Sequence, residues 1–101
     1  MAKITTITTD NNQYALKYGV NAFIDFENMA GMPITSLDGS MGFKELRSLL
    51  YVGLKWSDKK LTEHDAGEIF DELLNDLGME EASQQLVDAM TSALGQKALP
   101  S

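Results

Sequence analysis

Residues 41–56 read MGFKELRSLLYVGLKW, and this stretch decides the fold. Its apolar residues and one glycine recur at spacings of three and four, the repeat that places side chains on one face of an α-helix. They are Phe43, Leu46, Leu49, Leu50, Gly53 and Leu54. Ser40 is a candidate N-cap for this helix, and we expect Trp56 to close it. Because the segment is the most apolar of the chain, the helix should lie at the centre of the core.

Two more amphipathic helices are predicted on the C-terminal side, over residues 62–77 and 79–94. The first has the clearest start, because Thr62 followed by Asp65 gives the capping-box pattern of a hydroxyl and an acid three residues apart. Gly78 separates the two helices, since glycine commonly ends a helix. Both helices carry acidic residues on the face opposite their apolar stripe.

A β-hairpin over residues 3–18 and a short helix over residues 20–30 are predicted on the N-terminal side. Residues 3–9 are rich in isoleucine and threonine, whose branched side chains suit a strand. Residues 10–13 are Asp-Asn-Asn-Gln, which is typical of a turn. Because a lone hairpin is marginally stable, we expect it to pack on the helices or on another subunit.

The fold class that follows is mainly α (α+β): a short N-terminal β-hairpin followed by about four helices packed as a small bundle. A chain of 101 residues with 44% hydrophobic residues suits one domain. We therefore predict a single globular domain over residues 1–95 and a flexible C-terminal tail over residues 96–101.

The charge balance favours a soluble protein that avoids polyanions. Fifteen acidic residues face eight basic ones, for a net charge of -7. This balance opposes binding to nucleic acid and to an anionic membrane, and it favours basic partners. No apolar run approaches the roughly 20 residues that span a bilayer, and no secretion signal follows Met1. We expect a cytoplasmic protein without membrane or nucleic-acid partners.

Residue patterns that would support catalysis, a cofactor or a metal are missing from the sequence. His64 is the only histidine and there is no cysteine, so a structural zinc site is not expected. Neither Asp10 nor Asp58 begins a calcium-loop pattern with its central glycine. The paired carboxylates fall on polar helix faces, and no nucleophile elbow or phosphate loop occurs. We therefore expect a protein-binding domain that is not an enzyme.

Candidate partner-binding residues come from apolar side chains near helix ends and faces. Methionine suits adaptable binding surfaces and also fills irregular gaps in a core, so both roles stay open. The same two alternatives, core or partner contact, apply to the aromatic end of the central helix and to the apolar stripe of the last one. The candidates are Met29, Met32, Tyr51, Trp56, Leu86, Met90 and Leu94.

The order of elements and four short segments together resemble a known family. The segments are YALKYG at residues 14–19, NAFIDFE at 21–27, LRSLLYVGL at 46–54 and LTEHDAGEI at 61–69. They resemble the tail assembly chaperones of long-tailed bacteriophages and related small proteins of gene-transfer agents, which share an L-R-x-L-L-Y-x-G-L helix followed by L-T-x-x-x-x-G-x-I. The resemblance covers about residues 14–95.

The resemblance implies a role in phage tail assembly without catalytic residues. Such chaperones coat the long helical tape-measure protein and keep it soluble until tail-tube subunits polymerise around it. The implied partners are the tape-measure protein and, as a second candidate, the tail-tube protein. The implied place is the cytoplasm of the bacterial host, with the protein absent from the mature virion. Self-association into rings or filaments is also expected, with the hairpin edge as a candidate seam.

Two other functions stay open at this point. One is a structural phage tail or head-tail connector subunit, although a tube subunit should be richer in strands. The other is a generic helical adaptor that binds proteins. The chaperone hypothesis makes a physical demand of its own. The apolar stripes of these helices should exceed what one domain buries and leave a surface for an amphipathic client.

Overall fold

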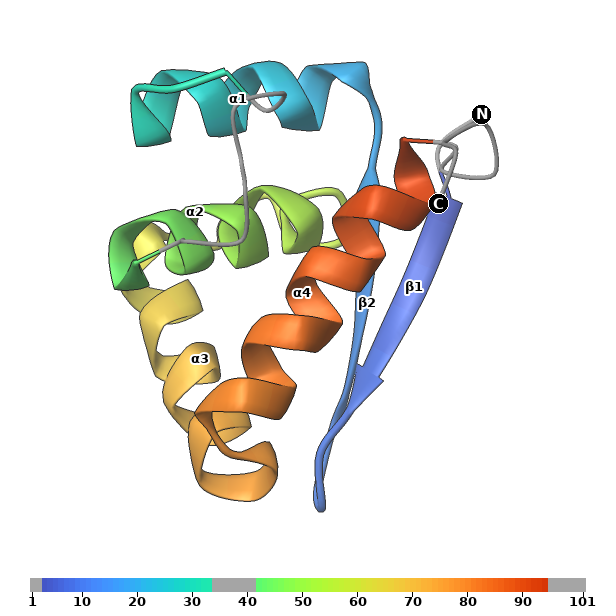
Figure 1. Ribbon diagram of the computed structural model, residues 1–101, viewed down its shortest axis with the longest axis vertical. Coiled ribbons are helices and arrows are strands. Elements are labelled where there is room, and N and C mark those ends of the chain that lie inside the picture. The colour runs from blue at the N-terminus through green and yellow to red at the C-terminus, as the bar shows by residue number, and fades with distance from the viewer. Residues whose placement is uncertain (1–2, 34–41, 95–101) are drawn as a thin grey trace.

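The computed structural model describes residues 3–33 and 42–94, which form two strands and four helices (Figure 1). The elements in chain order are β1 (Lys3–Thr8), β2 (Gln13–Tyr18), α1 (Val20–Ala30), α2 (Phe43–Leu54), α3 (Glu63–Leu77) and α4 (Met79–Ala93). The predicted fold class is confirmed: an N-terminal antiparallel hairpin is followed by four helices packed into a small globule.

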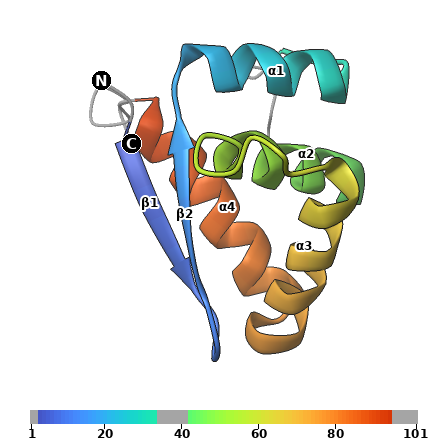
Figure 2. The same cartoon turned by 180° about the vertical axis from the view of Figure 1, so that it is seen from behind.

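Helix α2 lies at the centre, as its apolar sequence predicts. It packs against α1, α3, α4 and β2, and seven of its twelve residues are buried. Figure 2, seen from behind, shows α1 running alongside α2, and α4 packs against both α2 and the hairpin. The hairpin turn lies at the same end of the molecule as the α3–α4 junction, and β2 runs from there to α1 (Figure 1).

The hairpin covers one flank of the helices with alternate side chains. Its antiparallel register pairs Ile7 with Tyr14 and Thr5 with Leu16. Because alternate residues of a strand point to the same face, Ile7 and Leu16 both reach the core, where they are fully buried. Packing against α2 and α4 gives the two strands the support that an isolated hairpin lacks.

Two predicted helix ends are confirmed with their caps. The N–H of Asp65 donates to Thr62 Oγ1 at 3.0 Å, and the N–H of Thr62 donates to Asp65 Oδ2 at 3.1 Å, which completes the capping box of α3. Gly31 follows α1 with φ of 74°, and its N–H donates to the carbonyl of Glu27 at 2.9 Å. Its positive φ is the conformation in which glycine commonly ends a helix.

The central helix is shorter than the predicted 41–56. It begins at Phe43 after Gly42, whose N–H donates to the Glu45 carboxylate at 2.9 Å. It ends at Leu54, so the prediction that Trp56 closes it is wrong. The indole N–H of Trp56 instead donates to the carbonyl of Ala15 on β2. The helical spacing of apolar residues could not predict this contact, because Ala15 is distant in the sequence.

Some predictions lie outside the described residues. They are the N-cap role of Ser40 and the flexible tail over residues 96–101. The last helix differs from its predicted range of 79–94 by one residue, because α4 ends at Ala93 and Leu94 is its C-cap.

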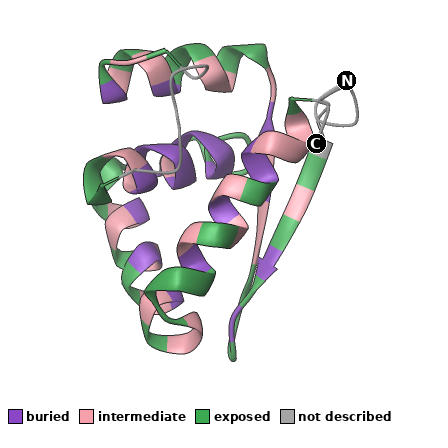
Figure 3. Ribbon diagram, in the orientation of Figure 1, coloured by how far each residue is buried: buried purple, intermediate pink, exposed green. Residues whose placement is uncertain are grey.

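One hydrophobic core draws on all six elements. Figure 3 shows buried residues concentrated on α2 and on the inner side of α4. The largest fully buried side chains are Tyr18, Phe26, Ile7, Leu16, Leu46, Leu49, Leu50, Leu73 and Leu86. This core fixes the end of β2 against α1 and α2, and the candidate site lies at that place.

Candidate partner-binding site

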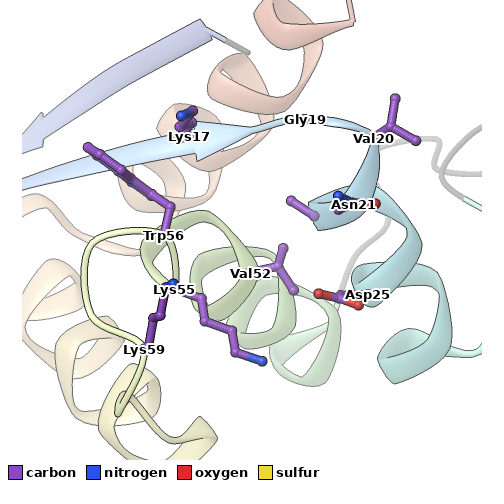
Figure 4. Close-up of a pocket in the computed structure, with 10 residues that line it drawn as sticks. Lys17, Gly19, Val20, Asn21, Asp25, Val52, Lys55, Trp56 and Lys59 are labelled. Carbon is purple, nitrogen blue, oxygen red and sulfur yellow. The ribbon is translucent and has the colours of Figure 1, made fainter. Parts of the chain in front are cut away.

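A groove of about 620 Å³ lies between the start of α1 and the end of α2, beside the last residues of β2. We call it the Trp56 groove. Figure 4 shows Trp56 on one side, Val20 and Asn21 on the other, and Val52 between them. Its lining residues are Lys17, Gly19, Val20, Asn21, Ala22, Asp25, Val52, Lys55, Trp56 and Lys59. The lining therefore combines an apolar base with charged and polar residues.

The Trp56 wall is fixed against the outside of the hairpin. The indole Nε1–H donates to the carbonyl of Ala15 at 3.0 Å. The ammonium of Lys17 lies 5.3 Å from the centroid of the indole ring, which is a favourable cation–π distance. Trp56 is still 41% exposed, so part of the residue remains open to solvent.

The opposite wall is the first turn of α1, which Tyr18 holds in place. The Tyr18 ring stacks on Phe23 of α1, with centroids 5.8 Å apart, and its hydroxyl donates to the carbonyl of Leu49 in α2 at 2.6 Å. Burial raises the pKa of Tyr18 well above its usual value of 10, so the phenol stays neutral and keeps its proton for that hydrogen bond. One buried side chain therefore fixes β2, α1 and α2 relative to one another.

Gly53 allows this close approach of β2 to α2. A Cβ atom at Gly53 would lie 2.7 Å from both the hydroxyl oxygen and the Cζ atom of Tyr18. Such a contact is too short for real side chains, so only glycine fits at this position without a shift. Gly53 belongs to the LRSLLYVGL segment of the sequence. The close contact with the Tyr18 ring is the structural reason for a glycine at this position of the segment.

The rim of the groove is basic. Lys17, Lys55 and Lys59 line it, and among the described residues Asp25 is the one acidic residue of the lining. Within residues 3–33 and 42–94, the ion pairs are Arg47–Glu63 at 3.4 Å and His64–Glu68 at 3.6 Å. None of the three lysines is therefore paired with a carboxylate in this part of the chain. The result is a local excess of positive charge on a chain whose net charge is -7.

Of the seven candidate residues from the sequence, the structure brings Trp56 to the groove and places the others elsewhere. Met29, Met32 and Tyr51 are partly buried and pack against the core. For these residues, partner contact stays a prediction.

The three candidate residues near the end of the chain, on and just after α4, differ in their burial. Leu86 and Met90 are buried in the core of this structure, whereas Leu94, at the end of α4, is 42% exposed. Leu94 does not line the groove. Partner contact by these residues stays a prediction, and the two buried ones could take part only if the core rearranged.

Sequence reasoning missed Val20, Val52 and the three lysines. Lys17 is far in the sequence from Lys55 and Lys59, and only the fold brings the three to one groove. Val20 is the first residue of α1. It is 74% exposed, the highest value among the large apolar residues described.

A second polar cluster, the Glu72 junction, ties the hairpin turn to α3. The Glu72 carboxylate accepts hydrogen bonds from the hydroxyls of Thr9 and Tyr14 and, at 2.9 Å, from the Asn12 amide. The N–H of Asp10 donates to Asp76 Oδ2 at 3.0 Å. The carboxylate of Glu72 is thus occupied by donors from its own chain.

The pKa values at the Glu72 junction reflect these contacts. Hydrogen bonds from Asn12, Thr9 and Tyr14 lower the pKa of Glu72 below 4.5. Burial, together with the hydrogen bond to Glu72 and its negative charge, raises the pKa of Tyr14 to about 12. Both shifts favour an ionised Glu72 that accepts from a neutral phenol. The cluster therefore has the chemistry of a structural anchor.

Comparison of the chain with protein-family models, curated proteins and solved structures gives no match. Among the described residues, no group of three or more histidine, cysteine or acidic side chains is placed to hold a metal ion. In the same part of the chain, no helix is long and apolar enough to cross a membrane.

Proposed function

We propose that this chain is a non-catalytic assembly chaperone that binds an amphipathic client segment in the Trp56 groove. The observation that carries the proposal is the exposed apolar surface formed by Val20 and Trp56 on either side of a preformed groove. Contiguous apolar surface with a charged rim is typical of protein-binding sites. An amphipathic helix in an apolar groove is a common mode of recognition.

The proposed client is the tape-measure protein of a long-tailed phage. This part of the proposal is supported by the resemblance of residues 14–95 to tail assembly chaperones. A tape-measure chain is a long amphipathic helix that would aggregate if its apolar face stayed exposed. The chaperone would act in the cytoplasm of the bacterial host and be absent from the mature virion, with the tail-tube protein as a second candidate partner.

Self-association belongs to the same proposal. Several copies bound along a repeating client gain affinity from one another through avidity. In the described residues, β1 pairs with β2 alone, so its outer edge offers free backbone groups to another chain. Ile4 on β1 is also half-exposed, which adds apolar surface at that edge.

The direct test is co-expression with the tape-measure protein encoded in the same phage genome. We expect the client to stay in the soluble fraction and to co-elute with the chaperone in size-exclusion chromatography. A client that remains insoluble, with no co-eluting complex, would contradict the proposal.

A matched pair of variants links the activity to the groove. Val20 and Met79 are each the first residue of a helix and each exposed, but only Val20 lines the groove. Aspartate suits a helix N-terminus, so Val20→Asp and Met79→Asp should both fold. We expect Val20→Asp to abolish client rescue and Met79→Asp to retain it. If the two variants rescued the client equally well, the groove would not be the client-binding site.

Purified virions separate the chaperone from a structural subunit. We expect mass spectrometry of the particles to lack this chain while infected cells contain it. Stoichiometric amounts in the virion would contradict the chaperone proposal and support a tail or connector subunit.

A further inference from the structure

The charge around the Trp56 groove is opposite to the charge of the whole chain. Of the eight basic residues in the sequence, three line this groove, and the part of the chain that the structure describes contributes a single aspartate to the lining. The net charge of -7 by itself favours basic partners. Fields from exposed charges are largely screened beyond about 8 Å at physiological ionic strength, so the residues at the rim decide which segment binds there.

Two of the lysines that line the groove lie beside aromatic rings. The ammonium of Lys17 lies 5.3 Å from the centroid of the Trp56 ring, and that of Lys55 lies 5.3 Å from the centroid of the Tyr51 ring. These contacts restrict the conformations of the two lysine side chains. Neither they nor Lys59 has a carboxylate partner in the described chain. A bound carboxylate would supply the missing counter-charge beside an apolar surface, where water is displaced and charge pairs gain strength.

We infer that the Trp56 groove binds an acidic amphipathic segment of the partner protein. An apolar side chain of that segment enters between Val20 and Trp56, and its flanking carboxylates meet Lys17, Lys55 and Lys59. The inference rests on the proposed function of the groove and deepens it, because it names the chemistry of the bound segment. Within a long client, the groove selects stretches where aspartate or glutamate flanks the apolar stripe.

Two synthetic helical peptides test this preference directly. Both have about 18 residues, long enough for appreciable helicity, with leucine at helical spacing and no tryptophan. One carries glutamate at its polar positions and the other carries lysine. Trp56 is the only tryptophan of the chain, so its fluorescence reports the groove itself. We expect the glutamate peptide to shift Trp56 emission to the blue and to bind at least tenfold more tightly than the lysine peptide.

Adjacent lysines provide the matched control for charge. Lys59 lines the groove and Lys60 does not, although both are exposed on the same loop. Lys59→Glu and Lys60→Glu change the net charge equally. We expect Lys59→Glu to weaken glutamate-peptide binding about five- to tenfold and Lys60→Glu to weaken it less than twofold, because close rim charges act more strongly than distant ones.

The outcomes separate this inference from the proposed function. If neither peptide binds, both the groove proposal and the inference fail. If the lysine peptide binds as tightly as the glutamate peptide, the groove remains a binding site and the acidic preference is wrong. Equal losses in the two lysine variants would assign the effect to overall charge and overturn the inference. A second copy of the chain could also occupy the groove. In that case Trp56 emission would shift as protein concentration rises without peptide, and the shift would disappear in Val20→Asp. This result would also overturn the inference.

Discussion

The two ends of the hairpin are built in opposite ways. At the turn, the carboxylate of Glu72 is surrounded by donors from Thr9, Asn12 and Tyr14. At the other end, where β2 leads into α1, the lysines that line the groove have no carboxylate partner among residues 3–33 and 42–94, and Val20 and Trp56 are exposed. The first end satisfies its charge within the chain and so contributes to stability. The second leaves charge and apolar surface available, which is what a binding site requires.

The largest effect should come from Gly53→Ala. Its Cβ would lie 2.7 Å from the Tyr18 ring, which is buried, stacked on Phe23 and hydrogen-bonded to Leu49. Overpacking of this kind costs about 1–3 kcal/mol, more than the helix propensity that alanine gains over glycine. We expect a loss of that size in chemical denaturation, together with weaker peptide binding because the groove walls shift.

Gly67→Ala is the control for the clash. Gly67 is also inside a helix, but its Cβ would lie 3.4 Å from the Cδ atom of the flexible Arg47 side chain, an ordinary contact. Helix propensity then dominates, and we expect a gain of about 0.5–1 kcal/mol in the free energy of unfolding. A loss at Gly67 as large as that at Gly53 would mean that the Tyr18 contact is not the cause.

Glu72→Gln should lower stability at the turn end without changing the groove. The substituted amide keeps the shape of the side chain, but it loses the negative charge that strengthens the three hydrogen bonds. Thermal unfolding at neutral pH should show a lower Tm, and binding of the glutamate peptide should be unchanged. Weaker peptide binding in this variant would show that the two ends of the hairpin are coupled.

The stabilisation by Glu72 should depend on pH. Its pKa is lowered from 4.5 in the folded chain, so its contribution is present above pH 4.5 and is lost as the pH falls through the lower, folded pKa. The Tm difference between the wild type and Glu72→Gln should therefore be full at neutral pH and shrink below pH 4.5. A difference that stays constant into strong acid would argue against a charged Glu72 as the anchor.

The helices of this fold were predictable because their signals are local. Thr62 with Asp65 marks the start of α3, and Gly31 ends α1, since caps depend on residues that are neighbours in sequence. The end of α2 was not predictable in the same way. Trp56 leaves the helix to bond Ala15, and that partner lies 41 residues away in the chain.

Even less of the site could be read from the sequence. Methionines, aromatics and the apolar stripe of the last helix gave the candidate partner residues, but Leu86 and Met90 are buried in the core, where α4 packs against the hairpin, α2 and α3. The groove depends on residues contributed by β2, α1 and the end of α2. An excess of basic charge there is invisible in a composition that is acidic overall.

Trp56→Phe should have a smaller effect on stability than Gly53→Ala. Phenylalanine keeps an aromatic face in the groove but cannot donate to the Ala15 carbonyl, a bond of 3.0 Å in the wild type. Loss of one neutral hydrogen bond costs about 0.5–1.5 kcal/mol, and water reaching this exposed site should hold the loss near the lower value. Chemical denaturation measures it, and fluorescence anisotropy of a labelled glutamate peptide should show that binding persists.

Val20→Asp should have the smallest effect on stability and a large one on binding. Val20 is 74% exposed, so little apolar burial is lost, and an aspartate in the first turn of α1 interacts favourably with the helix dipole. We expect the free energy of unfolding to change by less than about 0.5 kcal/mol. The new carboxylate would repel the glutamate peptide, whose affinity should fall at least tenfold. A stability loss matching that of Glu72→Gln would mean that the groove end also anchors the hairpin, and the contrast between the two ends would fail.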